Sequence, residues 1–238
     1  MKRILAGTHA VTEALRAAAG SVHVVYVATH DVKLSQLAKD RNVRVEERTP
    51  DELDALAQGL RHQGVVAITG DFPYLDLDGL LASIEGPPLL LALDEVTDPH
   101  NFGAMIRSAV ALGAHGVLTL KDRAVPVTGA VVRASAGATE HARIARVTNL
   151  ARTLASLRDE RSMSIVGLDA EGTHDVDALP DAPSGRVVVV GSEGRGLRPL
   201  VRKQCTELAR IPMTSAIASL NASVAASIAL FALRHRAR

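Results

Sequence analysis

Short runs of almost unbroken apolar residues constrain the fold of this chain more than any other feature of its sequence. The segments LLLAL at 89–93 and VVVV at 187–190 are runs of this kind. A strand that is apolar at nearly every position is usually covered on both faces, as in a parallel sheet flanked by helices. We therefore predict an α/β fold with a mostly parallel sheet.

The order of the predicted elements divides the chain into two domains. Residues 1–72 are predicted to form a small α/β domain, 73–79 a linker that loses periodicity and contains a proline, and 80–238 a larger domain. The predicted strands are 21–27, 43–45, 65–69, 89–93, 117–120, 144–147, 164–168, 187–190 and 208–211. The predicted helices are 9–18, 32–40, 50–58, 101–112, 129–136, 149–160 and 219–234.

Composition narrows the possible functions. The 238 residues include 27 Lys and Arg against 26 Asp and Glu, so a nucleic-acid partner would meet a local patch and not a basic coat. With 3 Phe, 2 Tyr and no Trp, a row of base-stacking aromatics is excluded.

Cys205 is the single cysteine, which suits a reducing cytoplasm. No apolar run approaches the roughly 18 residues of a membrane span, so we expect a soluble cytoplasmic protein without membrane contact.

Ligands of open parallel sheets bind beyond the carboxyl ends of the strands, so polar residues in the segments that follow the predicted strands are candidates for a binding site. After 89–93, Asp98 and Pro99 are typical of a helix start, with Asn101 at the helix mouth and Arg107 further along. Two interpretations stay open. Asn101 caps the helix and Arg107 is a solvated cation, or both belong to a functional site.

After 187–190 comes the glycine-rich segment GSEGRG, at 191–196. Its spacing is G-x-x-G-x-G and not the dinucleotide pattern G-x-G-x-x-G, and Glu193 would place a carboxylate where a pyrophosphate needs donors. This argues against a nicotinamide-dependent dehydrogenase. The glycines could let the backbone approach an uncharged part of a ligand, or could simply form a tight turn with an exposed glutamate.

The third segment leads from Ile211 through Ser219 and Asn221 into a helix rich in small residues. A purely structural interpretation makes Ser219 the N-cap and Asn221 a first-turn residue. Across the three segments the polar residues are Asn, Arg, Glu and Ser, which suit positioning and electrostatic stabilisation better than covalent catalysis. His100 has no visible ligand partner and the histidines show no metal-binding spacing, so no metal is expected.

Together and in this order, the three segments resemble the SpoU family of RNA ribose 2'-O-methyltransferases, part of the SPOUT superfamily. The matching stretches are DEVTDPHNFGAMIRSAVALG at 94–113, GSEGRGL at 191–197 and IPMTSAIASLNASVA at 211–225. The sequences GTHAV at 7–11 and HQG at 62–64 also resemble the substrate-binding domain of the branch that methylates a guanosine of 23S rRNA.

The resemblance implies a trefoil-knotted C-terminal methyltransferase domain that binds S-adenosylmethionine as cosubstrate, needs no metal and normally forms a homodimer. It implies a catalytic set made of Asn101, Arg107, Glu193, Ser219 and Asn221. The backbone near Gly191, Ile211 and Leu220 would hold the cofactor, and RNA contacts are expected at His9, Arg61, His62 and Gln63.

The implied reaction is methyl transfer to a ribose 2'-hydroxyl. A guanidinium is a poor base, so we expect Arg107 to bind a neighbouring phosphate and stabilise the developing alkoxide, while Glu193 and Asn221 orient Arg107 or the ribose. Two alternatives to an rRNA enzyme stay open at this point. One is a methyltransferase that acts on tRNA, and the other is a catalytically silent RNA-binding homologue.

Overall fold

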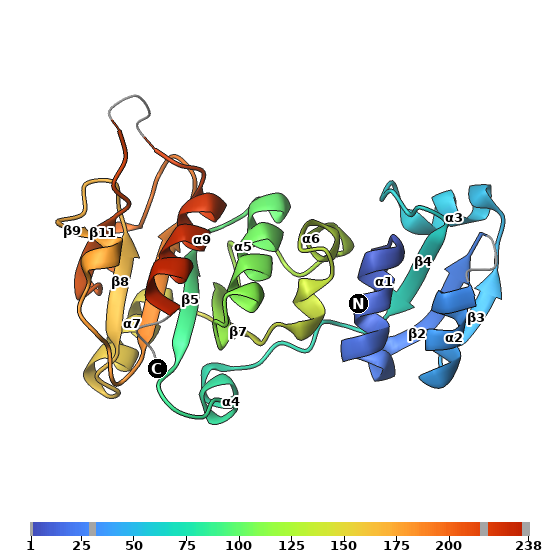
Figure 1. Ribbon diagram of the computed structural model, residues 1–238, viewed down its shortest axis with the longest axis horizontal. Helices are drawn as coiled ribbons and strands as arrows, with labels where there is room; N and C mark the ends of the chain where they lie inside the picture. Colours follow the sequence, from blue (N-terminus) through green and yellow to red (C-terminus); the bar gives the residue numbers. More distant parts are fainter. Residues whose placement is uncertain (1, 29–31, 215–218, 235–238) are drawn as a thin grey trace. The chain divides into compact units, whose positions relative to one another are not determined.

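The structure is a computed structural model that describes residues 2–28, 32–214 and 219–234 (Figure 1). Packing divides these residues into two compact units. The first contains the chain up to Pro73 together with Phe102–Arg107 and Pro126–His141. The second contains Tyr74–Asn101, Ser108–Val125 and the chain from Ala142 onward.

The first unit contains a four-stranded sheet in the order β1-β4-β2-β3. Its strands are β1 (Arg3–Ala6), β2 (Val22–Val27), β3 (Arg44–Glu47) and β4 (Val65–Thr69). The central strand β4 runs antiparallel to β1 and β2, and β3 runs parallel to β2. The sequence predicts the last three strands but misses β1, because four residues are too few for a clear periodic signal.

Helices accompany this sheet at nearly the predicted positions. They are α1 (Thr8–Ala17), α2 (Val32–Asp40), α3 (Pro50–Ala57) and α6 (Gly129–Ala134). The start of α3 is fixed by a capping box, in which the Thr49 side chain accepts from the Glu52 N–H and the Glu52 carboxylate accepts from the Thr49 N–H. Leu53 and Ala57 of α3 pack with Val66 of β4 in a small apolar core.

The second unit contains a seven-stranded sheet whose strand pairs are all parallel, which confirms the predicted mostly parallel α/β fold. The strand order is β7-β6-β5-β10-β8-β11-β9. The strands are β5 (Leu89–Asp94), β6 (Gly116–Leu120), β7 (Ile144–Val147), β8 (Ser164–Leu168), β9 (His174–Asp175), β10 (Arg186–Gly191) and β11 (Glu207–Arg210). The trefoil knot that the resemblance implies stays a prediction.

Helices bury both faces of this sheet, which explains its apolar strands. On one face Leu90 and Val189 join a core with side chains of α4 (Leu77–Ala82), α7 (Leu150–Asp159) and α8 (Pro199–Arg202). Alternate strand residues point to the other face, where α9 (Ala222–Leu233) packs against β10 (Figure 1). On that side the Ser227 hydroxyl of α9 donates to Ser108 Oγ of α5 (Pro99–Ala111) at 2.7 Å.

The strand order places a topological switch point between β5 and β10. From β5 the chain continues through α5 to β6 and β7 on one side, whereas β8, β11 and β9 lie on the other side of β10. In the parallel register Gly191, at the end of β10, lies opposite Asp94, at the end of β5. Ligand sites of open α/β sheets lie outside such points, so the fold directs attention to these two strand ends.

The segment predicted as a linker, 73–79, is partly ordered into regular structure. Leu75 forms an isolated bridge with Ala145, and α4 begins at Leu77 with Asp76 as its N-cap. The sequence misses α4, α8 and β9 because six, four and two residues give no usable periodicity. The division into domains at this segment stays a prediction.

Candidate active site

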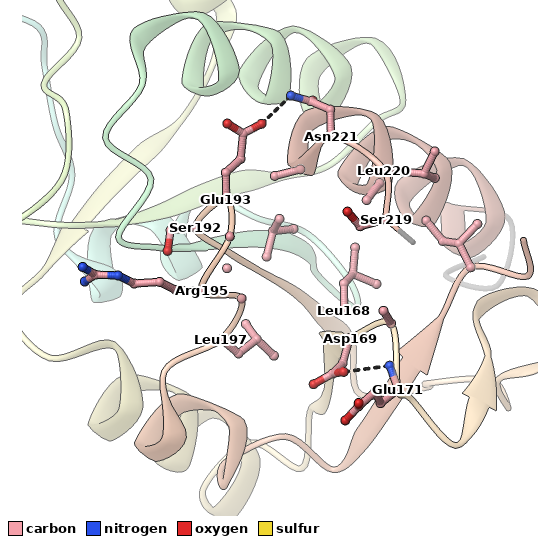
Figure 2. Close-up of a pocket in the computed structure, with 18 of the residues that line it drawn as sticks. Leu168, Asp169, Glu171, Ser192, Glu193, Arg195, Leu197, Ser219, Leu220 and Asn221 are labelled. Carbon is pink, nitrogen blue, oxygen red and sulfur yellow. Dashed lines mark hydrogen bonds between the residues drawn. The ribbon is translucent and has the colours of Figure 1, made fainter. Parts of the chain in front are cut away.

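A cavity of about 800 Å³ lies at the carboxyl end of the parallel sheet, beyond β8, β10 and β11 (Figure 2). Its volume is within the range of small-molecule sites. The wall is built from the ends of these strands and from the segment that leads into α9. It contains residues 168–171, 190–197 and 219–222, together with Arg202, Ala209, Ile211, Met213 and Ala225.

Gly191 allows the glycine-rich loop to fold back against the end of β10. A Cβ on Gly191 would lie 2.1 Å from the carbonyl carbon of Gly196 and 2.5 Å from the Leu197 nitrogen. The return is closed by an antiparallel bridge in which the Gly196 N–H donates to the Ser192 carbonyl at 2.9 Å. The segment thus forms a tight turn with an exposed Glu193, and its glycine backbone lines the cavity. The approach of an uncharged part of a ligand to this backbone stays a prediction.

Asn221 joins two of the predicted catalytic residues through its side-chain amide. Its Nδ2 donates to Asn101 Oδ1 at 3.0 Å and to Glu193 Oε1 at 2.5 Å, and Figure 2 shows the second of these bonds. Its Oδ1 accepts from the Ser223 and Val224 N–H groups, so Asn221 is the N-cap of α9. The interpretation of Ser219 as that cap is therefore wrong, and α9 begins at Ala222.

The structure also excludes one interpretation of Asn101, in which this residue caps α5. Asp98 is the N-cap of α5, where its carboxylate accepts from the Asn101 N–H at 2.9 Å. Asn101 is not the cap, and its buried side chain is turned to Asn221 instead. Because the carboxylate of Asp98 satisfies the helix end, the Asn101 amide is available to the site.

Ser219 and Arg107 are placed differently from the other three predicted catalytic residues. Ser219 is exposed at the cavity wall (Figure 2). Arg107 is exposed on α5, about 9 Å along the helix axis from Asn101 at 1.5 Å per residue. Neither side chain makes a hydrogen bond or ion pair with another described residue.

The predicted cofactor residues Gly191, Ile211 and Leu220 all line the cavity. The sequence missed the opposite wall, which begins at Leu168 and Asp169 after β8. Asp169 shapes that wall, since Oδ2 accepts from Arg202 Nε at 2.9 Å and Oδ1 accepts from the Glu171 N–H at 2.9 Å. The sequence does contain a signal for this wall, because it predicts a strand at 164–168 and the segment after that strand meets the same edge of a parallel sheet.

Cys205 does not belong to the cavity wall. Burial raises the pKa of its thiol to about 11, so the thiol is protonated at neutral pH.

Among the described residues, no group of three or more His, Cys, Asp or Glu side chains is placed to hold a metal ion. In the same part of the chain, no helix has the length and apolar character that crossing a bilayer requires.

The predicted RNA-binding residues come together in the first unit. Gly7 precedes α1, has a positive φ of 99° and donates its N–H to the Val65 carbonyl at 3.0 Å. This bond places the segment that holds His9 beside 61–64, so that a Cβ on Gly7 would lie 3.5 Å from Gln63 Oε1. His9, Arg61 and Gln63 are exposed, and His62 Nε2 lies 3.0 Å from Asp54 Oδ1.

The fold and the cavity define an α/β protein with a small-molecule site at the carboxyl ends of β8, β10 and β11 and with polar side chains suited to positioning a ligand. Comparison with known proteins makes this specific. Residues 88–231 match the SpoU rRNA Methylase family, and residues 4–75 match the RNA 2'-O ribose methyltransferase substrate-binding family.

Relatives and solved structures agree with these matches. The 23S rRNA (guanosine-2'-O-)-methyltransferase RlmB of Bordetella pertussis is 42% identical over 96% of this chain and 95% of its own length. RlmB of Ralstonia nicotianae is also 42% identical, over 98% and 96%. The structure of the SpoU methyltransferase AviRb from Streptomyces viridochromogenes with AdoMet is 26% identical, with a TM-score of 0.82 over 99% of this chain and 90% of AviRb.

The chain therefore belongs to the SpoU family, and it is an S-adenosylmethionine-dependent RNA 2'-O-methyltransferase. The residues of the cavity fit this cosubstrate. Aliphatic side chains of Leu168, Ile211 and Leu220 can cover a purine, and the bare backbone at Gly191 permits close approach. The carboxylate of Glu193 suits the positive charge of a sulfonium.

Proposed function

We propose that the protein methylates the ribose 2'-hydroxyl of a guanosine in 23S rRNA. The observation that carries this proposal is the 42% identity to RlmB of Bordetella pertussis over 96% of the chain, which includes both the substrate-binding and the methylase segments. Ribosomal RNA is a cytoplasmic substrate, so we place the protein in the cytoplasm. The retained set of Asn101, Glu193 and Asn221, joined by hydrogen bonds, argues against a silent homologue.

In this proposal S-adenosylmethionine supplies an electrophilic methyl group, and the chain positions the hydroxyl. Both amide hydrogens of Asn221 are donated, to Asn101 and Glu193, so Glu193 is held through Oε1. Glu193 Oε2 has no partner among the described residues and can accept a hydrogen bond from the substrate. Arg107, which has no ion pair with another described residue, binds a phosphate beside the target ribose and stabilises the developing alkoxide. The proton of the hydroxyl leaves to solvent or to a nearby acceptor as the methyl group is transferred from the sulfonium.

The substrate can be identified directly. Total RNA from a strain that lacks the gene is incubated with the protein and with cosubstrate labelled on the methyl group, and the labelled nucleotide is mapped. We expect one 2'-O-methylguanosine in 23S rRNA. Label in the tRNA fraction would reassign the substrate, and no label in any RNA, with S-adenosylhomocysteine binding intact, would overturn the proposal.

We also propose that the N-terminal domain selects the RNA through His9, Arg61, His62 and Gln63. Residues 1–72 carry nine Lys and Arg against nine Asp and Glu, so selection must come from a local surface and not from net charge. The family matches support the division into domains, since one ends at residue 75 and the other begins at residue 88. The C-terminal domain would carry the trefoil knot.

Arg61→Glu is expected to raise the KM for RNA and leave the affinity for S-adenosylhomocysteine unchanged. If Arg61 contacts one phosphate, the slope of log Kd against log salt should fall by about 0.7, the value for a single-stranded contact. The matched control is Arg41→Glu, which makes the same charge change at another exposed arginine of this unit. Equal effects of the two variants would mean that overall charge, and not this surface, controls RNA binding.

A homodimer through the C-terminal domain completes the proposal. The outer face of α9 exposes Val224, Ile228 and Phe231, which are 45%, 36% and 55% exposed. Their spacing of four and three residues forms one stripe along the helix. An apolar stripe of this kind suits burial against a second copy, as is normal in the family that the sequence resembles.

Phe231→Glu is expected to shift the protein from dimer to monomer at micromolar concentration, because it would bury a charge in the apolar interface. Light scattering measures the mass. Val32→Glu is the matched control, since Val32 is another exposed apolar residue, 68% exposed, in the first unit. A wild-type protein that is already monomeric would refute the dimer.

A further inference from the structure

An ion pair between a buried carboxylate and a partly exposed arginine lies at the base of the glycine-rich loop. Asp94 ends β5 and has no exposed surface. Its Oδ1 accepts from Arg198 Nε at 2.7 Å and lies 2.6 Å from Arg198 Nη2, and its Oδ2 accepts from the Arg198 N–H at 2.9 Å. A buried carboxylate is strongly unfavourable unless it is paired, so Arg198 is the group that permits this burial.

Both ends of the loop 192–197 are anchored at Asp94. At the start, Gly191 lies opposite Asp94 in the parallel register of β10 and β5. At the end, Arg198 is held by the Asp94 carboxylate. The loop therefore leaves β10 beside Asp94 of β5, and at its other end it returns to the carboxylate of the same Asp94.

The anchoring of both loop ends at Asp94 matters because two glycines inside the loop restrain its backbone only weakly. Gly194 and Gly196 have positive φ angles of 77° and 64°, and glycine restrains the backbone less than any other residue. Glu193 is exposed on this loop, and its one hydrogen bond among the described residues runs to Asn221. Its placement therefore depends on this bond and on what holds the two ends of the loop.

The pair also connects the loop to the segment that carries Asn101. The chain runs from Asp94 to Asp98, the cap that frees the Asn101 amide. Beyond Asp94, Arg198 Nη1 donates to Glu95 Oε1 at 3.1 Å, and Arg123 donates to the same oxygen at 3.1 Å. Arg198 is thus bound on two sides of its guanidinium.

We propose that Asp94 and Arg198 form a positioning clamp that holds the loop 192–197, and with it Glu193, in the geometry that methyl transfer requires. Neither residue belongs to the cavity wall, so both act through Glu193 and not on the cosubstrate. The inference rests on the proposed function for the role of Glu193. Asp94 and Arg198 would then affect the rate of methyl transfer and not the choice of substrate.

The test compares Asp94→Asn and Arg198→Lys in the full-length protein. Asparagine keeps the shape of Asp94 but loses the charge, and lysine keeps the charge of Arg198 but loses the fork that binds both partners. We expect Asp94→Asn to speed amide hydrogen exchange of Gly196 and Arg198 and to lower kcat by about 10-fold to 100-fold, the scale of a misplacement near 1 Å. The KM for RNA should stay within about threefold, since RNA contacts are untouched. Arg198→Lys should fall between Asp94→Asn and wild type in both measurements.

Arg123→Gln is the matched control, because it removes only the outer ion pair of an arginine whose side chain is 74% exposed. Its exchange and kcat should match wild type. Wild-type exchange and kcat in folded Asp94→Asn, or an equal loss in Arg123→Gln, would overturn the clamp. If Asp94→Asn does not fold, Arg198→Lys carries the test alone, and wild-type values there would overturn it.

Failure of the clamp and failure of the proposed function give different results. A wild-type protein that methylates no rRNA contradicts the function. The hydrogen exchange of the loop and calorimetric binding of S-adenosylhomocysteine still report on the clamp in that case. An enzyme that methylates rRNA equally well with and without the Asp94 charge contradicts the clamp only.

Discussion

Arg107→Ala is expected to lower kcat for RNA methylation by about 100-fold to 1000-fold, the usual effect of removing one electrostatic stabiliser of a transition state. Arg107 has no ion pair or hydrogen bond with another described residue, so its loss leaves no buried partner and should not lower the free energy of unfolding. It is not part of the cavity wall, so the Kd of S-adenosylhomocysteine should stay within a few fold.

Two further variants separate charge from geometry. Arg107→Lys keeps a cation but not the planar fork that binds phosphate oxygens in pairs, so it should recover only part of the rate. Arg152→Ala removes another exposed arginine, on α7, and should leave kcat unchanged. Wild-type turnover of Arg107→Ala at saturating RNA would mean that Arg107 has no role in the transition state.

The parallel sheet could be predicted because its signal is local. The runs 89–93 and 187–190 are apolar at consecutive positions, and helices bury them from both faces of the sheet as expected. The helix start at Asp98 and Pro99 was also visible, since a cap followed by proline is a short-range pattern. The sequence leaves open which nearby side chain caps each helix. The structure excludes the capping interpretation of Asn101, because Asp98 caps α5, and it gives the cap of α9 to Asn221 and not to Ser219.

The parts of the site that sequence reasoning missed depend on strand order. Asp94 and Arg198 are 104 residues apart, and only the placement of β10 beside β5 brings them together. Leu168 and Asp169 belong to the cavity because β8 is the other neighbour of β10. A sequence without a known strand order shows which strand ends carry polar residues, but not which of those ends are adjacent.

Gly191→Ala is expected to raise the Kd of S-adenosylhomocysteine at least about tenfold, or about 1.4 kcal/mol, and to lower kcat by a larger factor. The added Cβ would lie 2.1 Å from the carbonyl carbon of Gly196, 2.2 Å from its oxygen and 2.5 Å from the Leu197 nitrogen. These are backbone atoms that cannot rotate away as a side chain would. The loop 192–197 must therefore leave its position along the cavity.

Gly20→Ala is the matched control, because a Cβ there would meet no atom within 4 Å and Gly20 has no positive φ. Calorimetry gives both Kd values, and circular dichroism shows whether each variant is folded. A folded Gly191→Ala with wild-type affinity and kcat would mean that the loop does not need to lie against β10. The close approach of Gly191 and Gly196 would then have no part in holding the cosubstrate, and the anchoring of this loop at Asp94 would lose its importance for the reaction.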